Sequence, residues 1–327
     1  MSLKGVKTAT NKAVAIETKK LERQRLGKRI MTNWQLYAML ILPIVYIIIF
    51  NYVPMLGVQI AFKKYNAAGG IWGSPWVGLA NFKKFFSYYN FGIILKNTIV
   101  LSVYHLYASF PLSVIFALAL NLVRNKFYKR TVQTITYLTH FISTVVLVGM
   151  MMQFFNTRIG IFPRIIEALG GEMGDIFGSP AAFPHLYVWS DVWKNMGWGS
   201  IIYLSALSSV DPELHEAAII DGASRAKRIW YIDVPTILPT IITMLILNMG
   251  KIMSIGFEKV YLMQNDLNIR ASEIISTYTY KVGLGSDFGV SDFSYGAAIS
   301  LFNSIINITL LCSVNAISRR VSETSLW

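Results

Sequence analysis

Long runs of apolar residues constrain this chain more than any other feature of its sequence. A bilayer core about 30 Å thick requires roughly 20 mostly apolar residues in a helix. Six stretches have that length and character: 36–60, 93–122, 132–155, 186–209, 236–257 and 295–317. The chain is 54% hydrophobic and 14% charged, whereas soluble domains are about one quarter charged. The pattern predicts an all-α, polytopic membrane protein with about six transmembrane helices.

The fourth stretch is the weakest, because Asp191, Lys194 and Asn195 interrupt it. Each charge near the centre of a bilayer costs about 2.5–3.5 kcal/mol on insertion scales. Asp191 and Lys194 are three residues apart and so share a helix face, which predicts that they pair with each other.

The distribution of basic residues supports six spans and sets their orientation. Eighteen Lys and Arg residues lie in the N-terminal tail, in 124–130, in 225–228 and at the C-terminal end, which six spans place on one side of the membrane. The connecting segments on the other side are longer and hold nine. Cytoplasmic segments of membrane proteins are enriched in Lys and Arg. The sequence therefore predicts cytoplasmic N- and C-termini, with residues 1–33 as an uncleaved basic tail and 34–327 as one transmembrane domain.

The net charge of +13 raises the alternative of nucleic-acid binding. The basic residues, however, cluster beside the apolar stretches, and the sequence has no zinc-finger spacing and no RNA-binding signature. We therefore expect no nucleic-acid partner, and we assign the charge to membrane topology.

Residues 211–235, between the fourth and fifth stretches, have the signals of two short helices joined by a hinge. Asp211 and Ser224 are suited to cap the two helices, and Pro212 stands at the first helical position, where a missing N–H does no harm. Gly222 is predicted to end the first helix. Pro235 is predicted to break the second helix just before the fifth span.

This segment resembles the EAA loop of binding-protein-dependent ABC importer permeases. The resemblance covers about twenty residues in register and is carried by Glu216, Ala217, Ala218, Asp221, Gly222, Ala223 and Pro235. In that family the loop is the helix that couples the permease to its ATPase subunits. The resemblance implies a cytoplasmic coupling loop at 211–235 within a type I ABC importer permease fold.

A second resemblance narrows the class of solute. The runs 33–37, 52–63 and 73–82 are similar to the LplB-type branch of carbohydrate permeases, which resembles the maltose-type permeases. This implies a sugar substrate, namely an oligosaccharide from polysaccharide breakdown, and a location in the bacterial plasma membrane.

The resemblance also implies partners: a second homologous permease subunit, two ABC ATPase subunits that bind ATP and Mg²⁺, an extracellular solute-binding protein, and membrane lipid. The chain lacks a phosphate-binding G-x-x-x-x-G-K-[ST] sequence and metal-ligand spacing among its four histidines. We therefore expect no catalytic residue, metal or cofactor in this chain.

Polar residues within the apolar stretches are candidates for the transport pathway, because such groups usually face the interior of a helical bundle. Tyr104, His140 and Asn248 are the three we single out. Hydrogen bonding between helices is an equally adequate reason for each. Two other functions stay open: an ABC permease for another solute, such as glycerol phosphate or an amino acid, and an ion-coupled secondary transporter.

Overall fold

The computed structural model describes residues 31–285 and 291–321, and nearly all of its regular elements are helices. Among these residues, the only extended pairing is an isolated bridge between Lys63 and Trp76. The all-α prediction is therefore confirmed. The predicted tail at 1–33 lies almost entirely outside the described residues. The chain divides into two units, one ending at Gln59 and one beginning at Ile60, and each is described by itself.

The first unit is a single interrupted helix of apolar residues. It consists of α2 (Trp34–Ile47), a π-helical turn η1 (Ile48–Tyr52), α3 (Val53–Met55) and the start of the 3-10 helix η2 (Leu56–Phe62). The π-helical turn directly precedes the turn with Pro54, which has no N–H to donate to an α-helical ladder. Trp34–Phe62 is 29 residues long and apolar enough to span a membrane, where the sequence predicts the first span.

The second unit holds the other long helices. They are α6 (Phe91–Leu122), α7 (Lys126–Leu138), α8 (Thr144–Phe154), α10 (Phe183–Leu207), α13 (Val234–Met249) and α17 (Phe293–Val321). α6, α17 and the continuous helix Arg225–Met249 are long and apolar enough to cross a membrane. With the first unit this gives four such helices among the described residues, or five if α7 and α8 form one broken span.

The predicted span at 132–155 is not one continuous helix. The chain bends by 99° between Lys126–Phe141 and Thr144–Phe154. Ile142 is extended, and Ser143 begins a new helix because its side chain accepts a hydrogen bond from the N–H of Val146 at 3.2 Å. Ser143, which lies within the predicted span, is therefore the N-cap of α8.

The weak fourth stretch does form a long helix, the 25-residue α10, although it is not among the helices that are apolar enough to cross a membrane by composition alone. α10 packs along α6 and also contacts α7 and α13. Tyr187, Val188 and Val192 are buried in this packing. Contacts with neighbouring helices thus surround the polar residues at the middle of α10. A hydropathy average takes no account of such contacts and counts these residues as if lipid surrounded them.

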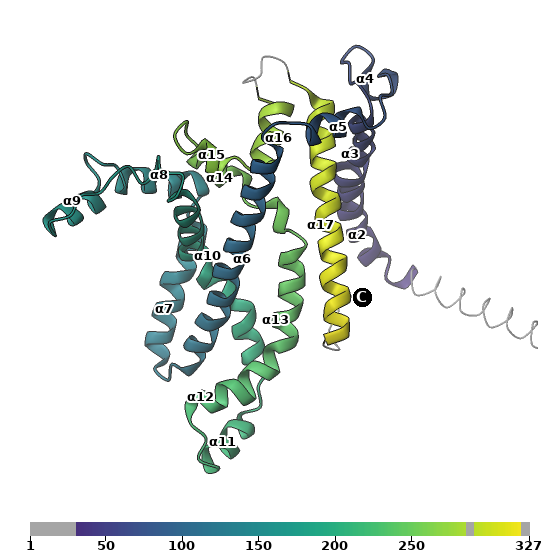
Figure 1. Cartoon of the computed structure of the whole chain (residues 1–327). Coiled ribbons are helices and arrows are strands. Elements are labelled where there is room, and N and C mark those ends of the chain that lie inside the picture. The colour runs from purple at the N-terminus through teal and green to yellow at the C-terminus, as the bar shows by residue number, and fades with distance from the viewer. Residues whose placement is uncertain (1–30, 286–290, 322–327) are drawn as a thin grey trace, which may run out of the picture. The chain divides into compact units, whose positions relative to one another are not determined.

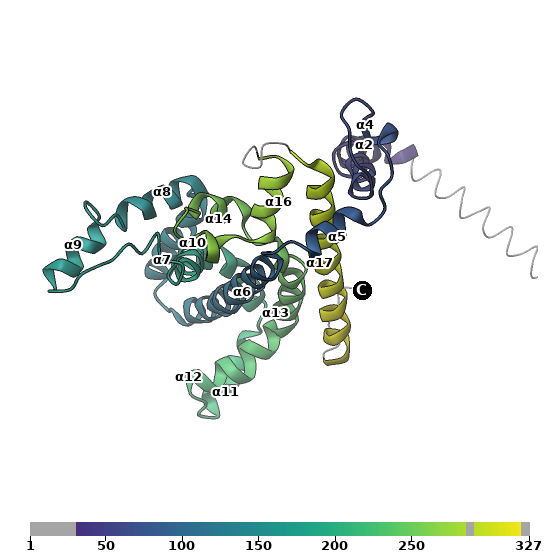
Figure 2. The same cartoon turned by 45° about the horizontal axis from the view of Figure 1, so that its top comes forward.

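Short helices gather at the two ends of the second unit (Figure 1). One end carries α11 (Pro212–Ile220) and α12 (Arg225–Arg228), which leads through the π-helical turn η4 (Ile229–Asp233) into α13. The other end carries α4 (Gly70–Gly73), α5 (Ala80–Phe86), α8, α9 (Ile161–Ala168), α14 (Phe257–Met263), α15 (Ile269–Ser272) and α16 (Ile275–Gly283). The long helices α6, α10 and α13 run between these ends in both views (Figures 1 and 2).

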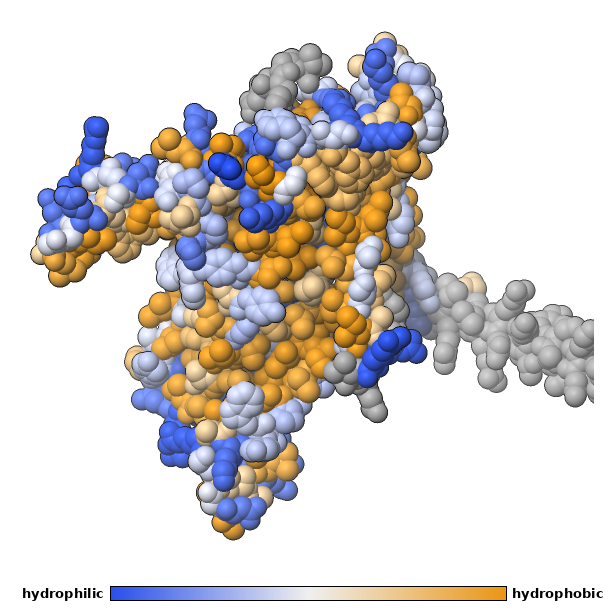
Figure 3. Space-filling view, viewed as in Figure 1, coloured by the Kyte–Doolittle hydropathy of each residue, from blue (hydrophilic) through white to orange (hydrophobic). Residues whose placement is uncertain are grey.

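The surface of this unit agrees with a position across a membrane. A broad hydrophobic band covers the long helices, and hydrophilic residues gather at the end with α11 and α12 and at the opposite end (Figure 3). Val100 and Val103 of α6 and Ile305 of α17 are among the apolar side chains that are exposed in the isolated chain. Lipid rather than water is the solvent that such a band requires.

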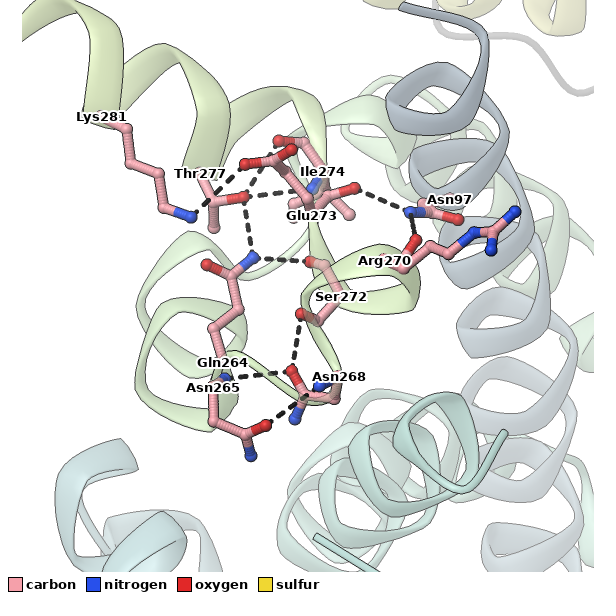
Figure 4. Close-up of polar contacts among 10 residues, drawn as sticks. All are labelled: Asn97, Gln264, Asn265, Asn268, Arg270, Ser272, Glu273, Ile274, Thr277 and Lys281. Atoms are coloured by element: carbon pink, nitrogen blue, oxygen red, sulfur yellow. Dashed lines mark hydrogen bonds and ion pairs between the residues drawn. The ribbon is translucent and has the colours of Figure 1, made fainter. Parts of the chain in front are cut away.

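The segment between α13 and α17 forms a compact polar turn instead of a simple loop (Figure 4). The fully buried Asn268 amide donates to the carbonyls of Phe177 and Met263 at 3.0 and 2.9 Å. Asn97 of α6 donates to the carbonyls of Arg270 and Glu273 at 2.9 and 3.0 Å. These bonds satisfy backbone groups that would otherwise be buried without partners, and they fix α14, α15 and α16 on α6.

Candidate functional site

The first part of the site is the segment 211–235, whose two helix ends follow from local sequence. Asp211 accepts a hydrogen bond from the N–H of Glu213 at 3.0 Å and so caps α11. After Ile220 the chain turns through Gly222, which has φ +73°. The N–H of Ala223 donates to the carbonyl of Ala218 at 2.8 Å, and that of Gly222 to the carbonyl of Ile219 at 3.0 Å. This pair of bonds is the Schellman motif, which prefers glycine at the left-handed position. The predicted caps and hinge are confirmed in geometry.

The prediction that Pro235 breaks the second helix is wrong. Ser224 caps α12 by accepting from the N–H of Lys227 at 3.3 Å, and the chain then stays helical from Arg225 to Met249. The π-helical turn η4 precedes Pro235, which occupies the second position of α13. The π-helical turn changes the hydrogen-bond ladder directly before Pro235, which has no N–H to donate, and the helix continues through the proline. The loop is therefore joined to α13 without a break.

A close contact between His215 and Asp233 links α11 to this helix. His215 Nε2 lies 3.2 Å from Asp233 Oδ1, and the Asp233 side chain is only 4% exposed. Asp233 is the last residue of η4, directly before α13. A displacement of α11 would therefore be transmitted to α13 at two points, through the chain itself and through the contact between His215 and Asp233.

Several other side chains of α11 are not covered by the described part of the chain. Ile220 is 86% exposed, and Leu214 and Ile219 are each about half exposed. Glu216 and Ala217 are also exposed, beside the partly buried Ala218. A cluster of apolar side chains at a polar end of the molecule is typical of a surface that binds another protein. With the exception of Pro235, which lies in α13, the residues that carry the EAA resemblance are thus brought together in α11 and the turn that follows it.

The second part of the site is a half-open cavity of about 640 Å³ between α6, η3 (Thr139–Phe141), α10 and α13. Its polar and aromatic lining includes His105, Ser109, His140, Asn195, Trp198 and Asn248. Of the three predicted pathway residues, His140 and Asn248 line this cavity. Tyr104 does not, because its hydroxyl contacts His185 Nδ1 at 2.8 Å and accepts from Trp189 Nε1 at 2.9 Å.

Sequence reasoning missed Asn195 and Trp198, which hold His140 in place. His140 Nδ1 lies 2.9 Å from Asn195 Oδ1, and the imidazole stacks on the Trp198 indole with centroids 4.5 Å apart and planes 3° from parallel. The spacing of three residues between Asn195 and Trp198 places both on one face of α10. That spacing was the available signal, but it does not identify His140 as their neighbour.

An ionic cluster lies beside the cavity and overturns the predicted pairing of Asp191 with Lys194. Asp191 Oδ2 is 2.7 Å from His105 Nε2, and its Oδ1 is 3.6 Å from Lys259 Nζ. Lys259, which the sequence places in a loop outside the spans, is only 4% exposed, and its ammonium donates to the carbonyl of Tyr187 at 2.8 Å. Asp191 therefore joins α6, α10 and α14, and it makes no ion pair with Lys194.

Comparisons with known proteins identify the family of the chain. Residues 109–323 match the family described as binding-protein-dependent transport system inner membrane component. Protein LplB of Bacillus subtilis (strain 168) is 41% identical over 292 residues, which are 89% of this chain and 91% of that protein. The polygalacturonan/rhamnogalacturonan transport system permease protein YteP of the same organism is 37% identical over 98% of this chain and 100% of its own length.

The fold also matches a solved structure. A chain in the crystal structure of a bacterial ABC transporter involved in the import of the acidic polysaccharide alginate superposes with a TM-score of 0.83 and 35% sequence identity. The match covers 91% of this chain and 99% of the other. The resemblance to the LplB-type branch of carbohydrate permeases is therefore confirmed over nearly the whole chain.

Proposed function

The chain belongs to the family of binding-protein-dependent transport system inner membrane components, and from that premise we propose that it is the permease subunit of an ATP-driven oligosaccharide importer. The observation that carries this proposal is the near full-length similarity to permeases of polysaccharide-derived sugars. Two features of the structure support it as well. The segment 211–235 forms a helix and turn suited to bind an ATPase, and a polar cavity lies inside the helical bundle. The substrate class is an oligosaccharide released from a polysaccharide.

The segment 211–235 is the part of the chain that meets the ATPase. We propose that Glu216, Ala217, Ala218, Asp221, Gly222 and Ala223 dock into one of two ATP-binding cassette subunits, which bind ATP and Mg²⁺. The small side chains permit close approach, and the exposed Ile220 supplies apolar area. Closure of the ATPases on ATP then moves α11, and the His215–Asp233 contact passes the motion to α13, which lines the cavity. Pro235 lies at the start of that helix.

The remaining partners follow from the same function. A second homologous permease subunit would complete the pathway, because the cavity is open on one side in this chain alone. An extracellular solute-binding protein would deliver the sugar, as the family description implies. His140 and Asn248 are candidates to contact the sugar, whereas Tyr104 supports α10 through His185 and Trp189.

The orientation follows from the loop charge and is testable with one cysteine. We expect residues 211–235 and both termini to be cytoplasmic in a bacterial plasma membrane. After Cys312, the only native cysteine, is replaced by serine, Ser224→Cys should resist a membrane-impermeant maleimide in intact cells and react after permeabilisation. Glu172→Cys, at the opposite end, should react in intact cells. Rapid labelling at 224 from outside would contradict the orientation and the coupling role.

The function itself is tested by transport in a defined system. Vesicles that contain this chain, the second permease and the two ATPase subunits should take up labelled oligosaccharide only when ATP, Mg²⁺ and the loaded binding protein are present. An ion-coupled secondary transporter would need no ATPase, and its uptake would follow an ion gradient. Uptake that persists without ATP, or that requires only a proton or sodium gradient, would contradict the proposal.

A further inference from the structure

The helices α8 and α9 form an arm, residues 144–168, that leaves the bundle sideways at the end opposite α11 (Figures 1 and 2). α8 is bent by 99° from the preceding helix, and its buried Leu147 and Met151 pack in one core cluster with residues of α10 and α14. The turn into α9 is tight, because a Cβ at Gly160 would lie 2.5 Å from the carbonyl oxygens of Phe154 and Asn156. Packing and this turn therefore set the direction of the arm.

The outer part of the arm, α9, is amphipathic. Ile161, Ile165 and Leu169 stand four positions apart, so they share one face of the helix, and each is half exposed or more. Arg164 and Glu167 lie on the other face. The far end of the arm is hydrophilic on its upper side and hydrophobic beneath (Figure 3). A short helix of this kind at the edge of a hydrophobic band is typical of a segment that lies in a membrane interface.

An open groove of about 510 Å³, here called the arm groove, lies between the arm and α10. Its apolar lining includes Met150, Phe155, Phe162, Trp189 and Trp193. The rings of Phe155 and Phe162 stack 4.7 Å apart and join the end of α8 to α9. No Asp, Glu, Lys or Arg lines the groove. Its polar side chains His185 and Ser190 already form hydrogen bonds within the chain. The groove therefore offers water few partners and fits a hydrocarbon chain.

The arm groove and the polar cavity lie on opposite faces of α10. Leu186 and Ser190 line the groove, whereas Gly199 and Ile202 line the cavity. With about 3.6 residues per turn, the two pairs point in opposite directions from the helix axis. The second permease that we propose to complete the cavity therefore meets the other face of α10. The face with the groove continues the hydrophobic band of the long helices, which leaves lipid as its neighbour.

A basic side chain stands in the turn that joins the two walls of the groove. Arg158 follows Phe155 by three residues and precedes Phe162 by four. The Asn156 side chain accepts from the N–H groups of Arg158 and Ile159 at 2.9 and 3.2 Å, which holds the turn in place. Arg158 is exposed, and within the described chain it makes no ion pair. A guanidinium at a membrane surface is suited to bind a lipid phosphate.

We propose that the arm groove binds one phospholipid of the leaflet at this end of the molecule, with an acyl chain in the groove and the phosphate on Arg158. The apolar face of α9 lies in the same interface. This site does not depend on which solute the chain transports, so it goes beyond the proposed function. The second permease is the other candidate to cover the apolar face of α9, and the experiments below separate the two.

The first experiment measures phospholipid binding to the complete transporter, purified in detergent. Phosphatidylglycerol is the probe, and native mass spectrometry counts the bound molecules. Arg158→Gln should weaken binding by about tenfold, as expected for the loss of a hydrogen bond between charged groups. Met150→Trp should prevent binding by filling the groove. Two matched controls should bind normally: Arg270→Gln, at an exposed arginine of the same end, and Ile305→Trp, at an exposed apolar residue of α17.

Each outcome of this experiment has one meaning. Full binding in Arg158→Gln or in Met150→Trp would overturn the site. An equal loss in Arg270→Gln would overturn it as well, because general attraction between charges would then explain the binding. Arg158 lies in an exposed turn, so its variant tests the site even where Met150→Trp disturbs the packing of α8.

The second experiment determines what covers the apolar face of α9. Cys312, the only native cysteine, is replaced by serine, and Ile165→Cys or Glu167→Cys places a fluorophore on one face of α9 in a transporter without other cysteines. In vesicles with brominated acyl chains, the label at 165 should be quenched several-fold more than the label at 167. Equal quenching at the two positions would overturn the proposal. Efficient cross-linking from position 165 to the second permease would also overturn it, and would assign the apolar face to that subunit.

Discussion

Gly222→Val should abolish ATP-driven uptake and release the ATPase subunits, while the protein still inserts and folds. Gly222 has φ +73°, a conformation that β-branched residues rarely adopt. Forcing valine there costs about 1 kcal/mol or more, and the Schellman bonds between Ala223, Gly222 and the end of α11 would be lost. A Cβ at this position meets no atom within 4 Å. The rest of the chain therefore tolerates the side chain, and the damage is confined to the turn that meets the ATPase.

A second glycine provides the matched control. Gly170 has φ +81°, and a Cβ there also meets nothing within 4 Å, but it directly follows α9, which lies at the end of the second unit opposite α11 (Figure 1). Gly170→Val should carry a similar local strain and leave ATPase association intact. Co-purification of the ATPase and vesicle uptake are the two measurements. Normal association and transport in Gly222→Val would show that the segment 211–235 is not the coupling element.

Local sequence was sufficient to predict the segment 211–235 because its structure depends on caps and turns. Asp211, Ser224 and Gly222 each act on backbone groups within a few residues, so their roles follow from spacing alone. Pro235 is the exception. Whether a proline ends a helix or begins one depends on the preceding turn, and the π-helical turn η4 has no signature that sequence reasoning could recognise.

Contacts between distant residues explain the features that the sequence did not predict. The bend after Phe141 depends on Ser143 capping α8 instead of facing another helix. α10 is long despite its low apolarity because α6, α7 and α13 surround it. One of the two partners of Asp191 is Lys259, which stands 68 positions later in a segment that the sequence places outside the spans. A hydropathy value reports only the average polarity of the residues in a segment, so it cannot identify which polar groups meet inside the bundle.

Asp191→Ala should destabilise the protein strongly, because Asp191 is a partner of the buried Lys259. The Lys259 side chain is only 5% exposed, and without Asp191 its ammonium would keep only the carbonyl of Tyr187 at 2.8 Å and the face of the Tyr187 ring. Removing one partner of a buried pair costs about 3–5 kcal/mol, because the other charge stays buried without compensation. His105 would also lose its 2.7 Å contact. We expect the unfolding midpoint of the purified transporter in detergent to fall by on the order of 10 °C.

A second substitution distinguishes the effect of the uncompensated buried charge from the effect of lost packing. In Asp191→Ala combined with Lys259→Met the buried charge is gone, and replacing a buried pair by apolar side chains is often close to neutral. The double variant should therefore recover most of the midpoint. Lys84→Met supplies the comparison for an exposed pair, since Lys84 and Asp292 lie 2.9 Å apart with side chains 56% and 37% exposed. Such a pair contributes about 0–1 kcal/mol, so the midpoint should hardly change. If Asp191→Ala is as mild as Lys84→Met, or if adding Lys259→Met deepens the loss, the contact between α10 and α14 does not stabilise the bundle through charge.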